Sequence, residues 1–227
     1  THTKLHNHNA ANRDFNPADL ERVRKGFIAK RENGLITDEK GRFVGNSDNY
    51  EFLRDGRECP ETVNPQLWRH ATLNAHHGLF KVADGVWQVR GYDISNITFI
   101  RGTHGWVVID PLTSEHTARA ALELMDEHIE KLPVTVVIFT HSHADHFGGI
   151  LGVTTKADVD AGRCQIVAPI GFLHETVGEN VIAGPAMGRR ATYQFDPRHP
   201  PGLIGHVDCG LGTGVPIGPP GLLAPTT

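Results

Sequence analysis

Apolar and polar positions along residues 79–109 follow the short period of β-strands. The run LFKVADGVWQVRG carries two short apolar stretches on either side of Asp84-Gly85, a dipeptide that favours a tight hairpin turn. The run ISNITFIRGTHGWVVIDP continues the pattern as a strand, a glycine-containing turn and a second apolar strand. The sequence therefore predicts a series of strands in this region.

The pattern then changes to the period of a helix. Residues 114–132 place Ala118, Leu122 and Met125 on one face, and Ser114 precedes them as a helix-capping residue. The following PVTVVIFT, residues 133–140, is an unbroken apolar run rich in β-branched residues, which predicts a strand buried on both faces. Strands, a helix and a buried strand in this order predict an α/β sandwich in which helices cover a mixed sheet.

Before this region the pattern is helical but weaker. Residues 1–15 are polar and lack periodicity, and we expect them to form an extended, loosely held arm. Residues 16–30 begin with Asn16-Pro17, and residues 63–77 carry Asn64-Pro65 at their second and third positions. Asparagine followed by proline is a pair typical of the start of a helix. Both stretches place apolar side chains on one face, as far as Phe27 in the first, so two helices are predicted.

After residue 140, residues 155–162 and 171–184 have helical patterns on either side of a short strand in RCQIVAP. Glycine and proline then occupy 17 of the last 44 positions, too many for regular structure, so a long connection is expected there. The surface on which it lies need not be part of this chain. We divide the chain into three regions. Residues 1–76 are an N-terminal arm with helices, residues 77–183 the first half of a sandwich domain, and residues 184–227 a Gly/Pro-rich connection. The domain is expected to continue beyond the chain end.

Composition narrows the possible functions. The balance of 39% hydrophobic and 21% charged residues is typical of a soluble globular protein. The net charge of −4 offers no basic surface for nucleic acid or for an anionic membrane, and no apolar run approaches the ~20 residues of a membrane span. The three cysteines lie far apart and are expected to be ordinary thiols. The chain starts at Thr1 without an apolar leader, which leaves a processed form and a fragment both open.

Candidate chemistry is concentrated in THSHADHFGG, residues 140–149. His141, His143, Asp145 and His146 fall within six positions, directly after the predicted buried strand. Ligand sites in open α/β sheets lie beyond the carboxyl ends of the strands. In the extended backbone of a strand exit, His141 and His143 point the same way and can bind one ion. Asp145 and His146 follow the turn and are better placed to bind a second.

The chemistry of these side chains fits that division. Imidazole nitrogen and carboxylate oxygen are normal zinc ligands, at roughly 2.0–2.2 Å. Two ions that share a hydroxide lie roughly 3.5–4 Å apart and make a strong nucleophile near neutral pH. The following Phe147-Gly148-Gly149 would let the backbone turn tightly against the site. A solvated, histidine-rich loop is the alternative, but the complete H-x-H-x-D-H pattern after a buried strand favours a metal site.

The same pattern resembles the signature of the metallo-β-lactamase superfamily. The predicted elements resemble the first half of its αβ/βα sandwich, here with an N-terminal helical extension. VVIDP places Asp110 where members usually carry an aspartate beneath the metal site. The resemblance implies that Asp110 orients ligands through hydrogen bonds, while a turn cap before Pro111 is the alternative. The segments FTHSHADHFGGILGV, ENVIAGPAMGRRATYQF and GHVDCGLGTGVP further resemble the zinc-dependent alkyl sulfatases, a similarity that runs from about Arg24 to the end.

This resemblance implies a function, a cofactor and a partner. Alkyl sulfatases hydrolyse esters such as dodecyl sulfate to an alcohol and inorganic sulfate and use two zinc ions. A homodimer and a periplasmic or secreted location are expected for the full-length protein. The motif carries over with His141 and His143 on one zinc and Asp145 and His146 on the other, and Asp145 also orients the nucleophilic water. The two further acidic ligands and one histidine of the family come from segments beyond Thr227.

Residues for the substrate and alternatives for the function stay open. MGRRATYQF brings Arg189, Arg190 and Tyr193 together, and arginine suits oxyanions, so Arg190 and Tyr193 are candidates to contact sulfate rather than surface residues. Other potential donors, such as His206 and Asp208, receive no metal role from the resemblance. Because four donors leave two ions under-coordinated, an inactive fragment is one alternative. A hydrolase of the same fold that acts on a thiolester, lactone or lactam is another.

Overall fold

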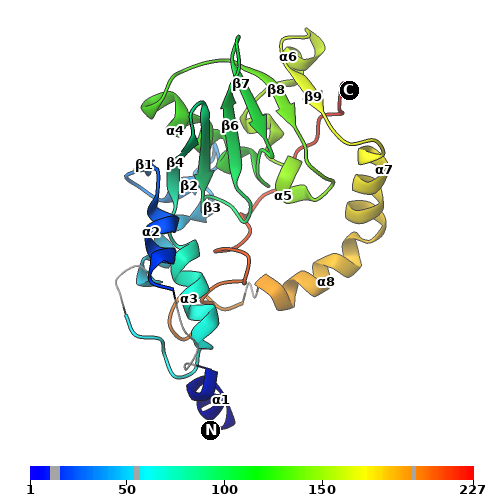
Figure 1. The fold of residues 1–227 in the computed structure, drawn as a ribbon. Helices are drawn as coiled ribbons and strands as arrows, with labels where there is room; N and C mark the ends of the chain where they lie inside the picture. The colour runs from blue at the N-terminus through cyan, green and yellow to red at the C-terminus, as the bar shows by residue number, and fades with distance from the viewer. Residues whose placement is uncertain (11–15, 54–56, 196–197) are drawn as a thin grey trace.

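A seven-stranded mixed sheet forms the centre of the molecule (Figure 1). The structure is a computed structural model that describes residues 1–10, 16–53, 57–195 and 198–227. The strands follow the order β1-β4-β5-β6-β7-β8-β9, in which the pairs from β1 to β7 are antiparallel and β7, β8 and β9 are parallel. Their bounds are Phe27–Ala29, Gly78–Ala83, Val86–Arg90, Ile97–Arg101, Trp106–Ile109, Val134–Ile138 and Gln165–Val167. The predicted mixed α/β sheet and its hairpin around Gly85 are confirmed.

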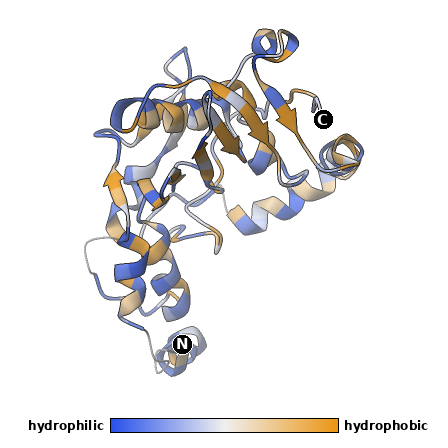
Figure 2. Cartoon of the chain, turned by 45° about the horizontal axis from the view of Figure 1, so that its top comes forward, coloured by the Kyte–Doolittle hydropathy of each residue, from blue (hydrophilic) through white to orange (hydrophobic). Residues whose placement is uncertain are grey.

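Helix α4, Glu115–His128, packs on one face of this sheet. Alternate residues of the central strands, such as Phe99, Trp106 and Val108, share one hydrophobic cluster with the apolar side of α4. The central strands are hydrophobic along most of their length (Figure 2). The predicted cap is also confirmed, because Ser114 Oγ accepts a hydrogen bond from the backbone N–H of His116 at 3.2 Å. Burial of this face therefore fixes both the helix and the register of the strands.

The prediction for β8 is right about the strand but wrong about its burial. Of its five residues only Val137 is fully buried, and Val136 and Ile138 are half-buried. The described residues bury one face of the sheet well and the other only in part, which accounts for the difference. An apolar run of β-branched residues indicates a strand whose second face can be covered, and in this structure that cover is incomplete.

The N-terminal region differs from the prediction in two places. Residues His2–Ala10 form helix α1 rather than an extended arm, whose remaining residues 11–15 lie outside the described ones. The helix predicted over residues 16–30 is confined to α2, Ala18–Arg24, and β1 follows it. Gly26 explains the change, because its φ of 77° ends a right-handed helix and turns the chain toward β4. The second predicted helix is confirmed as α3, Pro65–Asn74, capped by the side chain of Asn64.

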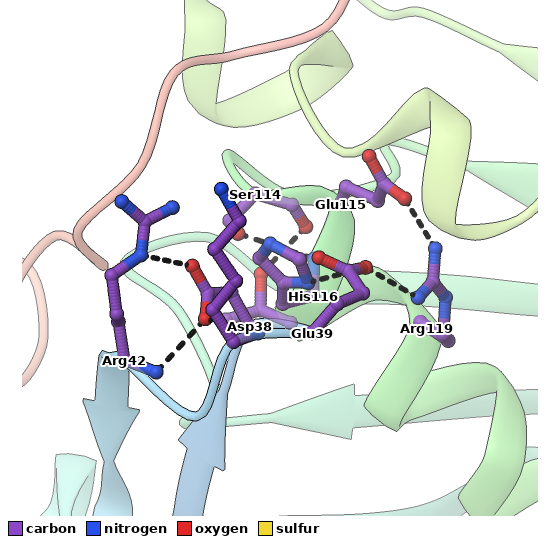
Figure 3. A network of polar contacts seen from close by, with 9 residues as sticks. Asp38, Glu39, Arg42, Ser114, Glu115, His116 and Arg119 are labelled. Atoms are coloured by element: carbon purple, nitrogen blue, oxygen red, sulfur yellow. Dashed lines mark hydrogen bonds and ion pairs between the residues drawn. The ribbon is translucent and has the colours of Figure 1, made fainter.

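A small hairpin that the sequence did not predict lies beside α4. Its strands are β2, Leu35–Thr37, and β3, Phe43–Asn46, and the 3₁₀ helix η1, Ser47–Leu53, follows. The turn of the hairpin carries Glu39, whose carboxylate lies 3.1 Å from Arg119 and 3.7 Å from His116 on α4 (Figure 3). Arg119 also pairs with Glu115, so a network of charges holds the hairpin against the helix.

After the motif the chain is mostly helical. The elements are α5, η2, α6, α7, the π-helix η3 and α8, over Ala144–Phe147, Ile150–Gly152, Lys156–Asp160, Phe172–Val177, Gly178–Ile182 and Gly184–Phe195. Helix α8 contradicts the prediction that regular structure ends at Gly184. Proline at the second position of α8 explains this, because the first turn of a helix does not need that backbone N–H. Of the described helices, none has the length and apolar character that a membrane span would need.

The Gly/Pro-rich connection after α8 lies against this chain itself. Ile217 donates a backbone hydrogen bond to Val44 of β3 at 2.8 Å, and Gly221 donates one to Gly148 at 2.7 Å. At the end of the chain, the backbone N–H of Thr226 bonds to Ile166 of β9 at 2.8 Å. The connection therefore runs from the small hairpin past the motif to the edge of the sheet.

Candidate metal centre

The H-x-H-x-D-H motif lies where β8 ends, beside the end of the parallel strand β7. Asp110 directly follows β7, and His141 follows β8 after two residues. The chain bends at His141 and Ser142, His143 has extended backbone angles with φ −70° and ψ 138°, and α5 begins at the next residue. His141 and His143 therefore belong to the strand exit, whereas Asp145 and His146 belong to the first turn of a short helix.

The four predicted donors form one group. The ring centroid of His141 lies 4.6 Å from that of His143 and 4.2 Å from that of His146. His146 Nε2 lies 3.3 Å from Asp145 Oδ2. All three rings and the carboxylate therefore lie together beyond the carboxyl end of β8.

One nitrogen of each ring is engaged by a neighbouring oxygen. Thr140 Oγ1 lies 3.0 Å from His141 Nδ1, and Asp110 Oδ2 lies 2.9 Å from His146 Nδ1. For His143 the engaged atom is the other nitrogen, because Glu179 Oε1 lies 3.0 Å from Nε2. An imidazole binds a metal through an unprotonated nitrogen, and a hydrogen bond at the opposite nitrogen selects the tautomer. The nitrogens left for an ion would thus be Nε2 of His141 and Nδ1 of His143, whereas Nε2 of His146 faces the Asp145 carboxylate.

Asp110 links the two strand ends. Its carboxylate accepts hydrogen bonds from Thr140 N at 2.9 Å and Thr140 Oγ1 at 2.7 Å, in addition to its contact with His146. Its backbone has a φ of 54°, a left-handed conformation that is uncommon for a residue with a side chain. Such strain is found where surrounding contacts hold a residue in place, often at functional sites. These contacts fix the orientation of the His146 ring relative to the end of β7.

The charges in this group shift several pKa values. Burial alone would lower the pKa of His146, but hydrogen bonds to Asp110 and Asp145 raise it to about 9. Burial lowers the pKa of His141, which favours its neutral, metal-binding form. Burial also opposes ionisation of Asp145, but its contacts with His146 hold the pKa of that carboxyl below the usual value. The site therefore combines two carboxylates with imidazoles of different basicity.

This donor set fits a metal ion in kind. Three imidazoles and a carboxylate are normal ligands of zinc. In the described parts of the chain, however, no three His, Cys, Asp or Glu side chains converge closely enough to enclose an ion. On this geometry alone the described residues of the motif do not form a complete metal site.

Gly148 and Gly149 allow α5 to pack against the segment after β7. A Cβ atom on Gly149 would lie under 3.0 Å from the carbonyl oxygens of Pro111 and Ser114, and one on Gly148 equally close to that of Thr113. Both glycines have ordinary right-handed backbone angles or values near them, so the need for glycine comes from the close approach. The tight packing expected from the sequence is present.

Sequence reasoning missed three residues near the motif. Glu179 contacts His143, and the Ser95 hydroxyl donates a hydrogen bond to the backbone oxygen of Asp145. Asp93 is buried and accepts hydrogen bonds from Thr113 and Thr117, next to the segment on which the glycines pack. All three contacts join residues far apart in sequence, so no local pattern reveals them. The one available signal was that Glu179 belongs to ENVIAGPAMGRRATYQF, a family-like segment.

The structure does not bring the predicted substrate residues to the motif. Arg190 and Tyr193 lie on α8 and are exposed, Tyr193 to 89%. Within the described part of the chain, neither makes a hydrogen bond or ion pair with the motif. A cavity of about 590 Å³ lies between β3, α8 and the C-terminal connection, and Tyr50, Phe195 and Ile217 are among its lining residues. No motif residue lines this cavity.

Comparisons with known proteins show the family of the chain. A family model described as the metallo-β-lactamase superfamily matches residues 90–227. A linear primary-alkylsulfatase from Pseudomonas sp. is 48% identical over 202 residues, which cover 89% of this chain and 30% of the relative. Alkyl/aryl-sulfatase BDS1 from Saccharomyces cerevisiae is 46% identical over 209 residues, covering 92% of this chain and 32% of the relative.

Solved structures give the same result. The stereoselective inverting sec-alkylsulfatase Pisa1 from Pseudomonas sp. has a TM-score of 0.94 and 40% identity. The match covers 100% of this chain and 36% of that protein. The chain thus spans about a third of the length of these relatives. Its mixed sheet and flanking helices match the same fold.

Proposed function

The chain belongs to the metallo-β-lactamase superfamily, and we propose that it carries the first half of the active site of an alkyl sulfate hydrolase. The reaction converts an alkyl sulfate ester to an alcohol and inorganic sulfate. One observation carries the proposal: three histidine rings and a carboxylate gather at the end of β8 in a chain 46–48% identical to two alkylsulfatases. Because the chain spans only a third of those relatives, the activity is proposed for the complete protein.

We propose zinc as the metal, with two ions in the complete site. His141 and His143 would hold one ion, and Asp145 and His146 the other. The bound ions would supply positive charge for the sulfate group and lower the pKa of a water molecule. Asp145 is proposed to orient that water, and Asp110 to hold the His146 ring with Nε2 facing the ion. Further ligands would come from residues beyond Thr227.

The remaining features of the complete protein are proposals that rest on the family resemblance. Arg190 and Tyr193 are proposed to contact the sulfate group, which requires that α8 face the completed site. We also propose a dodecyl sulfate type of substrate, a homodimer and a periplasmic or secreted location. The contact proposal has a direct test, since Arg190→Ala should raise KM for the sulfate ester more than it lowers kcat.

Sulfate release tests the proposed reaction. The complete natural protein that contains these 227 residues is incubated with dodecyl sulfate, and inorganic sulfate is measured. We expect release by the wild type and none by His141→Ala. Turnover of a thiolester, lactone or lactam without sulfate release, by protein with its metal bound, would assign the site to another hydrolase of this fold.

A further inference from the structure

We propose that Glu179 is a positioning residue that holds His143 with its Nδ1 atom toward the metal. The inference rests on the proposed metal site, but it concerns a contact within this chain. Glu179 Oε1 lies 3.0 Å from His143 Nε2, and the two residues are 36 positions apart in the sequence. No resemblance or local pattern assigned Glu179 a role.

The backbone around Glu179 is unusual. Glu179 is the second residue of η3, a single π-helical turn between α7 and α8. Such turns are rare and occur frequently at functional sites. The side chain of Glu179 is only 22% exposed, whereas that of His143 is 56% exposed. The carboxylate is thus more enclosed than the ring it contacts, which distinguishes it from a solvated surface carboxylate.

The contact has a definite chemical consequence. A carboxylate accepts hydrogen bonds but cannot donate one, so neutral His143 must carry its proton on Nε2. The lone pair is then on Nδ1, which becomes the nitrogen able to bind an ion. His146 differs, because carboxylates contact both of its ring nitrogens, Asp110 at Nδ1 and Asp145 at Nε2. Glu179 thus contacts one ring nitrogen of His143 and leaves the other available to an ion.

An ordinary surface ion pair is the competing explanation. Exposed pairs contribute little to stability and would not influence a neighbouring metal site. Glu175 offers a matched control, because it lies four residues earlier in α7, carries the same charge and is exposed. Among the described residues its side chain makes no hydrogen bond or ion pair. A general effect of negative charge near the motif would appear in both residues, and a positioning effect only in Glu179.

The first measurement reads the tautomer of His143 without metal. Long-range ¹H–¹⁵N spectra of ¹⁵N-histidine-labelled, metal-free protein at pH 8 distinguish protonation at Nδ1 from protonation at Nε2, and His143→Gln assigns the signals. The wild type should show the Nε2–H form. Glu179→Gln should keep it, because the amide oxygen still accepts a hydrogen bond. Glu179→Ala should show a mixture of both forms, and Glu175→Ala should match the wild type.

The second measurement is zinc affinity, determined by competition with a chelator in the complete protein. Loss of an outer partner of a ligating histidine typically lowers metal affinity about 10–100-fold, and we expect this for Glu179→Ala. Glu179→Gln should lose less, and Glu175→Ala nothing. Unchanged tautomer and affinity in Glu179→Ala would overturn the inference. Equal losses in the Gln and Ala variants would also overturn it, since Glu179 would then bind the ion directly.

These results are independent of the proposed reaction. Zinc binding that depends on Glu179, in a protein that releases no sulfate from dodecyl sulfate, would support the inference and contradict the proposed function. Sulfate release with zinc affinity unaffected by Glu179→Ala would do the reverse.

Discussion

Replacing Asp93 by asparagine tests how the structure supports the segment behind the motif. The Asp93 side chain is buried, and its Oδ1 accepts hydrogen bonds from Ile94 N at 2.7 Å and Thr113 Oγ1 at 2.6 Å. Oδ2 accepts from Thr113 N at 3.0 Å and Thr117 Oγ1 at 2.7 Å. Despite these four donors, burial raises the pKa of Asp93 from 3.8 to about 6.

The variant should lose one hydrogen bond without changing the shape of the side chain. An asparagine whose oxygen replaces Oδ1 keeps the bonds of Ile94 and the Thr113 hydroxyl. Thr117 Oγ1 can still donate to Ser114 O at 2.9 Å, so only the backbone N–H of Thr113 lacks an acceptor. A buried donor without a partner costs about 1–3 kcal/mol. We expect Asp93→Asn to lower the free energy of unfolding by this amount at pH 5.

The pH dependence gives the sharper test. Because the pKa of Asp93 is higher in the folded than in the unfolded protein, its protonated form favours folding. That contribution is fully present below about pH 4 and is lost as the pH rises through 6. At about 1.4 kcal/mol for each pH unit, the whole loss is about 3 kcal/mol, and about half of it falls between pH 5 and 8. Asparagine does not titrate, so the advantage of the wild type over Asp93→Asn should shrink over this range.

Urea unfolding of metal-free wild type and variant at pH 5 and pH 8 measures this difference. Asp84→Asn serves as the control, because Asp84 is exposed in a turn where Asn-Gly is as favourable as Asp-Gly. Its effect on unfolding should be small at both values. An advantage of the wild type over Asp93→Asn that grew from pH 5 to pH 8 would refute the reasoning, because the four donors would then outweigh burial.

Three further predictions concern residues around the motif. Gly149→Ala should lower the free energy of unfolding in urea by about 1–3 kcal/mol, because the added Cβ would meet the Pro111 carbonyl. Gly188→Ala is the control and should not destabilise the protein, because its Cβ would enter open space. Asp110→Asn should weaken zinc binding about 10–100-fold in a chelator competition, and unchanged affinity would contradict its role with His146. Ser114→Ala should cost about 1 kcal/mol in the same urea assay; no loss would refute its role as a cap.

Local patterns were sufficient for the elements whose stability is set locally. The strands from residue 79 to 109 and helix α4 were predicted because their apolar periods match the face they bury. The caps at Asn64 and Ser114 were predicted because a capping side chain acts within three residues. The motif could be placed at a strand exit for the same reason, since its strand precedes it directly.

Elements that depend on distant partners were missed. Strand β1 has three residues and forms only because Gly26 turns the chain toward β4, about 50 residues later. Helix α8 was missed because its glycines and proline were counted together with the irregular residues that follow. The contacts of Asp93 and Glu179 join segments 20 or more positions apart, which composition and periodicity do not reveal.

Zinc content tests the central claim most directly. The complete natural protein containing this chain is purified, dialysed at pH 7 and analysed for metal by mass spectrometry. The variant His141→Ala is analysed in the same way, after circular dichroism has shown that it is folded. The account predicts close to two zinc ions per wild-type chain and a clear loss in the variant. Wild-type protein without bound zinc, or a variant that binds as much as the wild type, would contradict the assignment of the motif as a metal centre.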